Sequence, residues 1–189
     1  MWPRMLLVCL TIATAGAAEL HKYDYRVLAT TKTSTMEKEM NEAADAGYAF
    51  HAVMGGESAF GGKEVVLVMG KPLGDGARST KRYKLLATKK TSTMEKELQE
   101  MGEEGFDYRG QTVFESTFGG REVSVILERD TEVAAKRFQY RLLATSKTST
   151  MQKELLEAGG AGFKLVGMTV AKTSFGGSEL VCILSKEAQ

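Results

Sequence analysis

Cysteine and histidine are scarce in this sequence, and charge of one sign is not concentrated anywhere along it. The 189 residues include two cysteines and two histidines, and 25 basic residues nearly balance 24 acidic ones. Evenly mixed charge offers no basic surface for nucleic acid and none for an anionic membrane. No phosphate-binding loop or dinucleotide fingerprint occurs, and no cysteine–histidine group has metal-site spacing. We therefore predict a protein without metal or cofactor and without a nucleic-acid partner.

Long apolar runs are also scarce, and the one near the N-terminus is short. Residues 1–4 are a basic start, residues 5–13 are apolar and uncharged, and residues 15–17 are small. This layout is typical of a secretory signal peptide, which we place at residues 1–17. Its apolar part is too short to cross a hydrocarbon core of about 30 Å. We expect a secreted or periplasmic protein with no membrane span.

Cleavage of that segment would leave Cys182 as the single cysteine, which excludes an internal disulfide. Small secreted domains often depend on disulfides, so the stability of this one must come from burial of apolar surface. Cys182 aligns with Leu67 and Val125 in a pattern repeated along the chain. We therefore interpret it as a buried strand residue and not as a reactive thiol.

The chain does contain one sequence unit that is repeated three times. The copies begin at Tyr25, Tyr83 and Tyr140 and align without a gap. Because each copy has complete strand and helix signals, they are tandem copies of one small domain. We assign repeat 1 to residues 23–70, a linker to 71–82, repeat 2 to 83–128, a linker to 129–138 and repeat 3 to 139–187.

Each copy predicts a helix after its first strand. Apolar residues at helical spacing form one stripe, which in the first copy contains Met36, Met40, Ala43 and Ala44. A serine stands three residues before a glutamate or glutamine in every copy, which is the pattern of a capping box. A glycine follows at the position where helices end in a left-handed residue. The serines are Ser34, Ser92 and Ser149, and the glycines are Gly47, Gly105 and Gly162.

Two more strands follow the helix, joined by a Phe-Gly-Gly segment that predicts a tight turn. The third strand is apolar on both faces, so we place it between the first and second, which then run parallel. One helix covers one sheet face only. The other face carries Val66, Val68, Ile126, Val181 and Ile183 and needs a partner.

The fold class that follows is α+β, with three tandem β-α-β-β units. We expect their sheets to pack around a pseudo-threefold axis with the helices outside. The protein would then be a monomer whose units form an internal trimer.

Part of the third copy resembles a known family. Residues 154–166 read Glu-Leu-Leu-Glu-Ala-Gly-Gly-Ala-Gly-Phe-Lys-Leu-Val. This resembles the E-L-x-x-x-G-x-x-G-W-x-L-V signature of a family of small bacterial β-α-β-β domains of unknown function, with Phe163 in place of the tryptophan. The second copy keeps Leu98, Gly102 and Phe106 of that pattern. The resemblance implies a fold and a bacterial source, and no activity.

The Lys-Thr-Ser-Thr segment before each helix is a candidate anion site. A helix N-terminus has free N–H groups and the positive end of a dipole, and a lysine and three hydroxyls stand beside it. The alternative is structural, with the serine as cap and the threonines bonded to the loop backbone. A cap alone does not require the lysine and both threonines in all copies. The candidates are Lys32, Thr33, Ser34, Thr35, Lys90, Thr91, Ser92, Thr93, Lys147, Thr148, Ser149 and Thr150.

No catalytic set is recognisable. Neither histidine is repeated, and His51 aligns with Arg109 and Val166, which predicts an exposed strand residue and not a base. We therefore predict a non-catalytic binding or structural protein, with a small anion or another protein as its partner. One alternative is an enzyme or binder for a small anionic ligand at the Lys-Thr-Ser-Thr helix starts. Another is an envelope assembly protein acting through open sheet edges.

Overall fold

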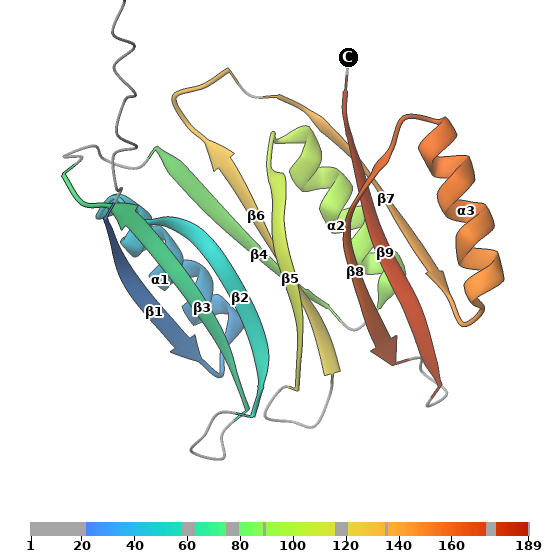
Figure 1. The fold of residues 1–189 in the computed structure, drawn as a ribbon, viewed down its shortest axis with the longest axis horizontal. Helices are drawn as coiled ribbons and strands as arrows, with labels where there is room; N and C mark the ends of the chain where they lie inside the picture. The colour runs from blue at the N-terminus through green and yellow to red at the C-terminus, as the bar shows by residue number, and fades with distance from the viewer. Residues whose placement is uncertain are drawn as a thin grey trace, which may run out of the picture.

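The computed structural model describes residues 22–57, 63–74, 80–88, 90–115, 121–134, 136–172 and 177–188. The predicted signal peptide at residues 1–17 lies outside the described residues, as do the Phe-Gly-Gly segments except for Gly177. Three units with the same order of elements follow one another along the chain (Figure 1). Unit 1 has β1 (Tyr23–Thr30), α1 (Thr33–Asp45), β2 (Ala49–Glu57) and β3 (Lys63–Pro72). Unit 2 has β4 (Lys81–Thr88), α2 (Thr91–Glu103), β5 (Asp107–Glu115) and β6 (Arg121–Asp130). Unit 3 has β7 (Phe138–Thr145), α3 (Thr148–Gly160), β8 (Lys164–Lys172) and β9 (Ser178–Glu187).

Each unit forms one three-stranded sheet with its last strand in the centre. The strand orders are β1-β3-β2, β4-β6-β5 and β7-β9-β8, and every pairing is antiparallel. The two outer strands of each sheet therefore run parallel, which confirms the predicted order. The central strands are apolar because they are buried, as Leu67, Val125 and Cys182 show.

The second strand of each unit contains a register shift. It lies between Phe50 and Ala52 in β2, and the same shift recurs in β5 and β8. A bulge leaves one residue out of the ladder and re-aims its neighbours. His51 occupies the shift in β2 and is exposed, as the sequence predicts.

The helices cover one face of each sheet through the predicted stripe. Met36, Met40, Ala43 and Ala44 are fully buried in α1, and equivalent residues are buried in α2 and α3. The glycines after the helices have the expected positive φ, with 93° at Gly47, 88° at Gly105 and 86° at Gly162. Both predictions are confirmed.

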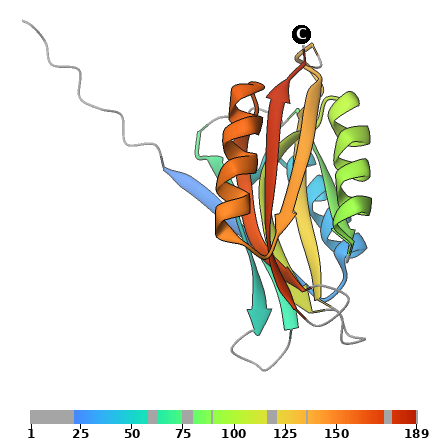
Figure 2. The same ribbon diagram turned by 90° about the vertical axis from the view of Figure 1, so that its right-hand side faces the viewer.

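The three units pack in a row. Helix α1 lies against β4 of unit 2, α2 lies against β7 of unit 3, and β5 contacts both β2 and β8. Among the described residues, no contact of similar extent joins unit 1 to unit 3, which stand at opposite ends of the row in Figure 1. The structure thus confirms an α+β fold and does not confirm the pseudo-threefold packing. Figure 2 shows α3 and α2 on opposite sides of the strands.

The reason for the row lies in what the second face of each sheet meets. Ile126 of unit 2 is buried in the core of unit 1, together with Met36 and Met40, and Ile183 of unit 3 is buried in the core of unit 2. Each sheet therefore packs against the preceding unit, so the contact has a direction. Among the described residues no unit precedes unit 1, and Val68, the equivalent residue there, is only half-buried.

A close approach between units occurs at Gly102 of α2. A Cβ atom there would clash with the carbonyl oxygen of Phe138 and would stand 2.9 Å from the ring of Tyr140. The aligned residue of α1 is Ala44, which is fully buried, and that of α3 is Gly159, around which the space is open. Gly102 is therefore required by packing, whereas Gly159 is not.

We predict opposite effects for the same substitution at these two glycines. Gly102→Ala should lower the free energy of unfolding by about 1–3 kcal/mol, because α2 and β7 must separate to fit the methyl group. Gly159→Ala is the matched control and should raise it by up to about 1 kcal/mol through helix propensity. Urea unfolding of both variants measures the difference. Equal effects would contradict the packing described for α2.

Candidate functional site

The three Lys-Thr-Ser-Thr segments form the turns between the first strand and the helix of each unit. Lys32, Lys90 and Lys147 directly precede the helices and are exposed. Each lysine N–H donates to the hydroxyl of the threonine two residues earlier. These bonds are 3.2 Å to Thr30, 3.3 Å to Thr88 and 3.2 Å to Thr145. The last threonine of the strand therefore organises the turn.

The predicted capping boxes are wrong. The helices begin two residues earlier than the pattern indicates, at Thr33, Thr91 and Thr148, and no side chain caps their first N–H groups. Ser34, Ser92 and Ser149 lie inside the first turn with exposed side chains. The glutamate that would complete the box is engaged elsewhere, on the next unit.

Helix side chains bond the outer edge of the strand that begins the next unit. One carboxylate oxygen of Glu37 accepts the Leu85 N–H at 3.0 Å, and the other contacts the Lys84 ammonium at 3.2 Å. Asn41 accepts the Tyr83 N–H at 3.0 Å and donates to the Tyr83 carbonyl oxygen at 3.0 Å. These bonds satisfy backbone groups on the outer side of β4, an edge strand whose other side pairs with β6.

The same arrangement recurs one unit further on. Glu95 accepts the Leu142 N–H at 3.2 Å, and Gln99 accepts the Tyr140 N–H at 3.1 Å. Sequence reasoning missed this role. The signal was present, because an acidic residue and a carboxamide recur at the same two helix positions in copies one and two.

The three candidate anion segments do not meet in one pocket. Each belongs to its own unit, and the three helices start along the lower edge of the molecule in Figure 1. Lys90 and Thr91 border a hollow of about 20 Å³ between units 2 and 3, which has room for about one water molecule. Its other walls include Leu142 and Val181.

A network of polar side chains lies between units 1 and 2 around Tyr83, which is 2 % exposed. The Tyr83 hydroxyl accepts the Phe50 N–H at 2.9 Å and donates to Glu128 at 2.7 Å. Arg109 donates to the other oxygen of Glu128 at 2.9 Å, and Lys81 lies 3.5 Å from it. Burial, chiefly, raises the pKa of Tyr83 well above its usual range. The phenol therefore stays protonated and joins the two units.

Lys81 carries this network outward to Asp130. Its ammonium lies 2.9 Å from the Asp130 carboxylate, which also accepts from the Thr80 hydroxyl at 2.7 Å. The bonds from Thr80 and then Lys81 hold the pKa of Asp130 far below its usual range. Burial opposes the charge on Lys81, but the bond to Asp130 and the charge of Glu128 leave its pKa raised. A hollow of about 140 Å³ lies beside this network. The charges that border it thus stabilise one another.

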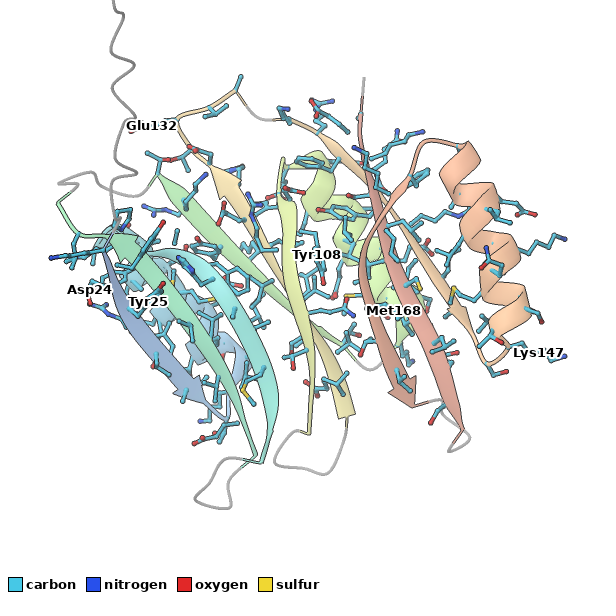
Figure 3. All side chains as sticks on the ribbon, viewed as in Figure 1. Asp24, Tyr25, Tyr108, Glu132, Lys147 and Met168 are labelled. Carbon is cyan, nitrogen blue, oxygen red and sulfur yellow. The ribbon has the colours of Figure 1, made fainter. Side chains whose placement is uncertain are left out.

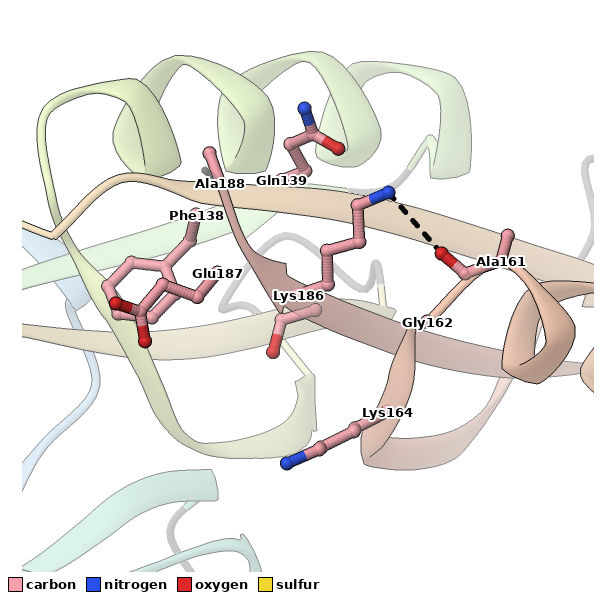
Figure 4. Close-up of a pocket in the computed structure, with 9 residues that line it drawn as sticks. Phe138, Gln139, Ala161, Gly162, Lys164, Lys186, Glu187 and Ala188 are labelled. Carbon is pink, nitrogen blue, oxygen red and sulfur yellow. Dashed lines mark hydrogen bonds between the residues drawn. The ribbon is translucent and has the colours of Figure 1, made fainter.

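A larger hollow, of about 680 Å³, lies in unit 3 where β7, β8 and the end of β9 meet (Figure 4). Lys186 reaches across it, donating to the Ala161 carbonyl oxygen at 3.3 Å and lying 4.8 Å from the Phe163 ring centre. The dashed line in Figure 4 marks this hydrogen bond.

The contact made by Lys186 is repeated in the other units and is structural. Lys71 bonds the end of α1 and lies 4.5 Å over the Tyr48 ring, and Arg129 bonds the end of α2 and lies 5.0 Å over the Phe106 ring. A cation at a helix C-terminus is favoured by the dipole, and its position over a ring adds a cation–π attraction. In the sequence, the sign of this contact is a basic residue just after the apolar core of each third strand.

Large apolar side chains are exposed at the two ends of the row. At the unit 1 end, Tyr25 is 57 % exposed and Val27 is 63 % exposed. At the unit 3 end, Leu156 is 67 %, Leu165 is 50 % and Met168 is 63 % exposed. Figure 3 labels Tyr25 on unit 1 and Met168 on unit 3. We call Tyr25, Val27 and Ala52 the first-end surface, and Gln152, Leu156, Gly159, Leu165 and Met168 the last-end surface.

No protein-family model, curated protein or solved structure matches the chain, so the resemblance to a bacterial domain family stays a prediction. Within the described ranges, no group of three or more histidine, cysteine or acidic side chains is placed to hold a metal ion. No helix in the part of the chain that the structure describes is long and apolar enough to cross a membrane.

Tyr83 offers a direct test of the junction between units 1 and 2. Tyr83→Phe should lower the free energy of unfolding by about 1–3 kcal/mol, because it leaves the Phe50 N–H and a Glu128 oxygen without their partner. Tyr25→Phe is the matched control at the aligned, exposed position and should change it by less than about 0.5 kcal/mol. Denaturant unfolding measures both. A Tyr83→Phe effect as small as that of the control would contradict the bridging role.

Proposed function

We propose that this protein is a secreted or periplasmic, non-catalytic interaction protein that binds other protein molecules through the two ends of its row of units. The observation that carries the proposal is the exposure of large apolar side chains at both ends. Repeat proteins normally close their ends with polar residues, because an exposed repeat interface promotes association with other molecules. The helix position that holds Asn41 in unit 1 and Gln99 in unit 2 holds Leu156 in unit 3. The last unit is therefore more apolar where a polar cap is expected.

The internal architecture supports a structural role. The hydrogen bonds around Tyr83 and the helix-end cations each hold two elements together. Secretion is supported by the basic start, apolar run and small residues of positions 1–17.

Site-specific photo-crosslinking in the source cells tests the proposal. A photoreactive residue at Leu165 should cross-link to protein, and one at Lys38 should not, because Lys38 lies on the exposed face of α1 away from the end surfaces. Protein recovered outside the cytoplasm should have a mass lower than that of the full chain by the mass of the signal segment. Equal cross-linking at both positions, or an intact Met1 on exported protein, would contradict the corresponding part of the proposal.

A second candidate function is anion binding at the helix starts. The observation that favours it is that all three helices lack a side-chain cap while an exposed lysine precedes each of them. The first-turn N–H groups are then available to a phosphate or sulfate. The Lys-Thr-Ser-Thr residues would act as three separate sites, one in each unit.

Anion binding should appear as thermal stabilisation. Phosphate or sulfate should raise the melting temperature relative to chloride at equal ionic strength, because a ligand that binds only the folded state stabilises it. Replacing Lys32, Lys90 and Lys147 together by alanine should remove the difference, whereas replacing the exposed helix lysines Lys38, Lys96 and Lys153 should keep it. An equal melting temperature in all salts would refute this candidate.

A further inference from the structure

We propose that the partner of the end surfaces is a second copy of this chain, bound head to tail, with α3 and β8 of one molecule against β1 and β2 of the next. This inference rests on the proposed function and names its partner. It follows from the interface between consecutive units, which the chain forms twice internally and leaves half-formed at each end.

The internal interface has the same parts at both junctions. On one side are the helix and second strand of the earlier unit, and on the other are the first strand and the bulge of the later unit. Phe50 and Val53 of β2 lie 3.1 and 3.3 Å from the position of a Cβ on Gly110. At the next junction, Tyr108 and Gln111 of β5 closely approach Gly167 in the same way.

The end surfaces are the unmatched halves of this interface. Tyr25 aligns with Tyr83 and Tyr140, which are 2 % and 5 % exposed because the preceding helix covers them. Nothing among the described residues covers Tyr25 to that extent. At the other end, Leu165 and Met168 stand where Phe50 and Val53 contact the following unit. The last-end surface of one molecule thus offers what the first-end surface of another lacks.

Particular contacts can be carried across to the intermolecular junction. The Leu165 N–H would donate to the Tyr25 hydroxyl of the second molecule, as the Phe50 N–H donates to Tyr83. Gln152 would accept the Val27 N–H through its side-chain oxygen, as Glu37 accepts from Leu85. Gly159 leaves open the space that the close approach at Gly102 needs. Ala52 has a methyl group where the internal junctions have Gly110 and Gly167, so Leu165 and Met168 of the other molecule must accommodate it.

One contact is not retained. Asn41 makes two hydrogen bonds with the Tyr83 backbone, and Leu156 at the aligned position of α3 makes neither. The intermolecular junction would therefore be weaker than the internal ones and would depend more on apolar contact. This difference separates a reversible contact between molecules from the permanent contacts within the chain.

The predicted association is heterologous, because each molecule uses two different surfaces. Such contacts build rings when the rotation closes and open chains when it does not. A heterologous association also predicts an outcome that a symmetric dimer does not. Two variants, each damaged at a different end, still have one compatible pair of intact surfaces between them.

Complementary mixing of end variants tests this directly, using the protein with the N-terminus it carries after export. The wild type should show concentration-dependent association in analytical ultracentrifugation below about 1 mM. Tyr25→Asp and Leu165→Asp should each weaken self-association by a factor on the order of ten or more. A mixture of the two should form a one-to-one complex. Val133→Asp, which changes a similarly exposed apolar residue in the segment between units 2 and 3, should associate as the wild type does.

A second variant tests the register of the contact. Leu156→Asn restores the carboxamide of α1 and should tighten association, because it can bond the Tyr25 backbone as Asn41 bonds Tyr83. Leu156→Ser removes the apolar contact without that bond and should weaken it. Weakening by both variants would show general hydrophobic adhesion and would overturn the proposed register.

The remaining outcomes separate this inference from the proposed function. A wild type that stays monomeric throughout the concentration range refutes the second-copy partner. So does a mixture of end variants that fails to associate, provided that both variants keep the wild-type circular dichroism and melting temperature. If position 165 then still cross-links to a different protein in cells, the proposed function stands and this inference alone fails.

Discussion

The outer edge of each unit's first strand is the constraint on which the rest of the structure depends. An edge strand exposes backbone N–H and carbonyl groups that must find partners or remain open to other chains. This protein satisfies them with two side chains from the preceding helix, Glu37 and Asn41 at the first junction and Glu95 and Gln99 at the second. Because these helix side chains bond the first strand of the next unit and not that of their own, the contact between units has a direction, and a row results.

Folding within a unit was largely predictable from the sequence. The stripe through Met36 and Met40, the glycine at Gly47 and the doubly apolar third strand each reflect one local requirement, and each is confirmed. These signals are visible because a helix period, a positive φ and burial on two faces each restrict residue type strongly.

Relations between units were harder to predict. The capping box failed because Ser34 and Glu37 have the right spacing for a cap, while the carboxylate bonds a strand more than 40 residues away. The pseudo-threefold packing was inferred from an apolar second face, and that face does find a partner. Apolar pattern shows that a surface is buried but not which neighbour buries it, so a row and a ring were not distinguished. The role of Tyr83 depends on Phe50 and Glu128, which come from different copies and share no local pattern.

The basic residues that close the helix ends, Lys71, Arg129 and Lys186, act entirely within their own units. The helix residues Glu37, Asn41, Glu95 and Gln99 bond the first strand of the following unit. Two separate sets of positions therefore govern the internal stability of a unit and its attachment to a neighbour. A duplication or deletion of one whole unit would preserve both sets, so the length of such a row can change in evolution without redesign of the unit itself.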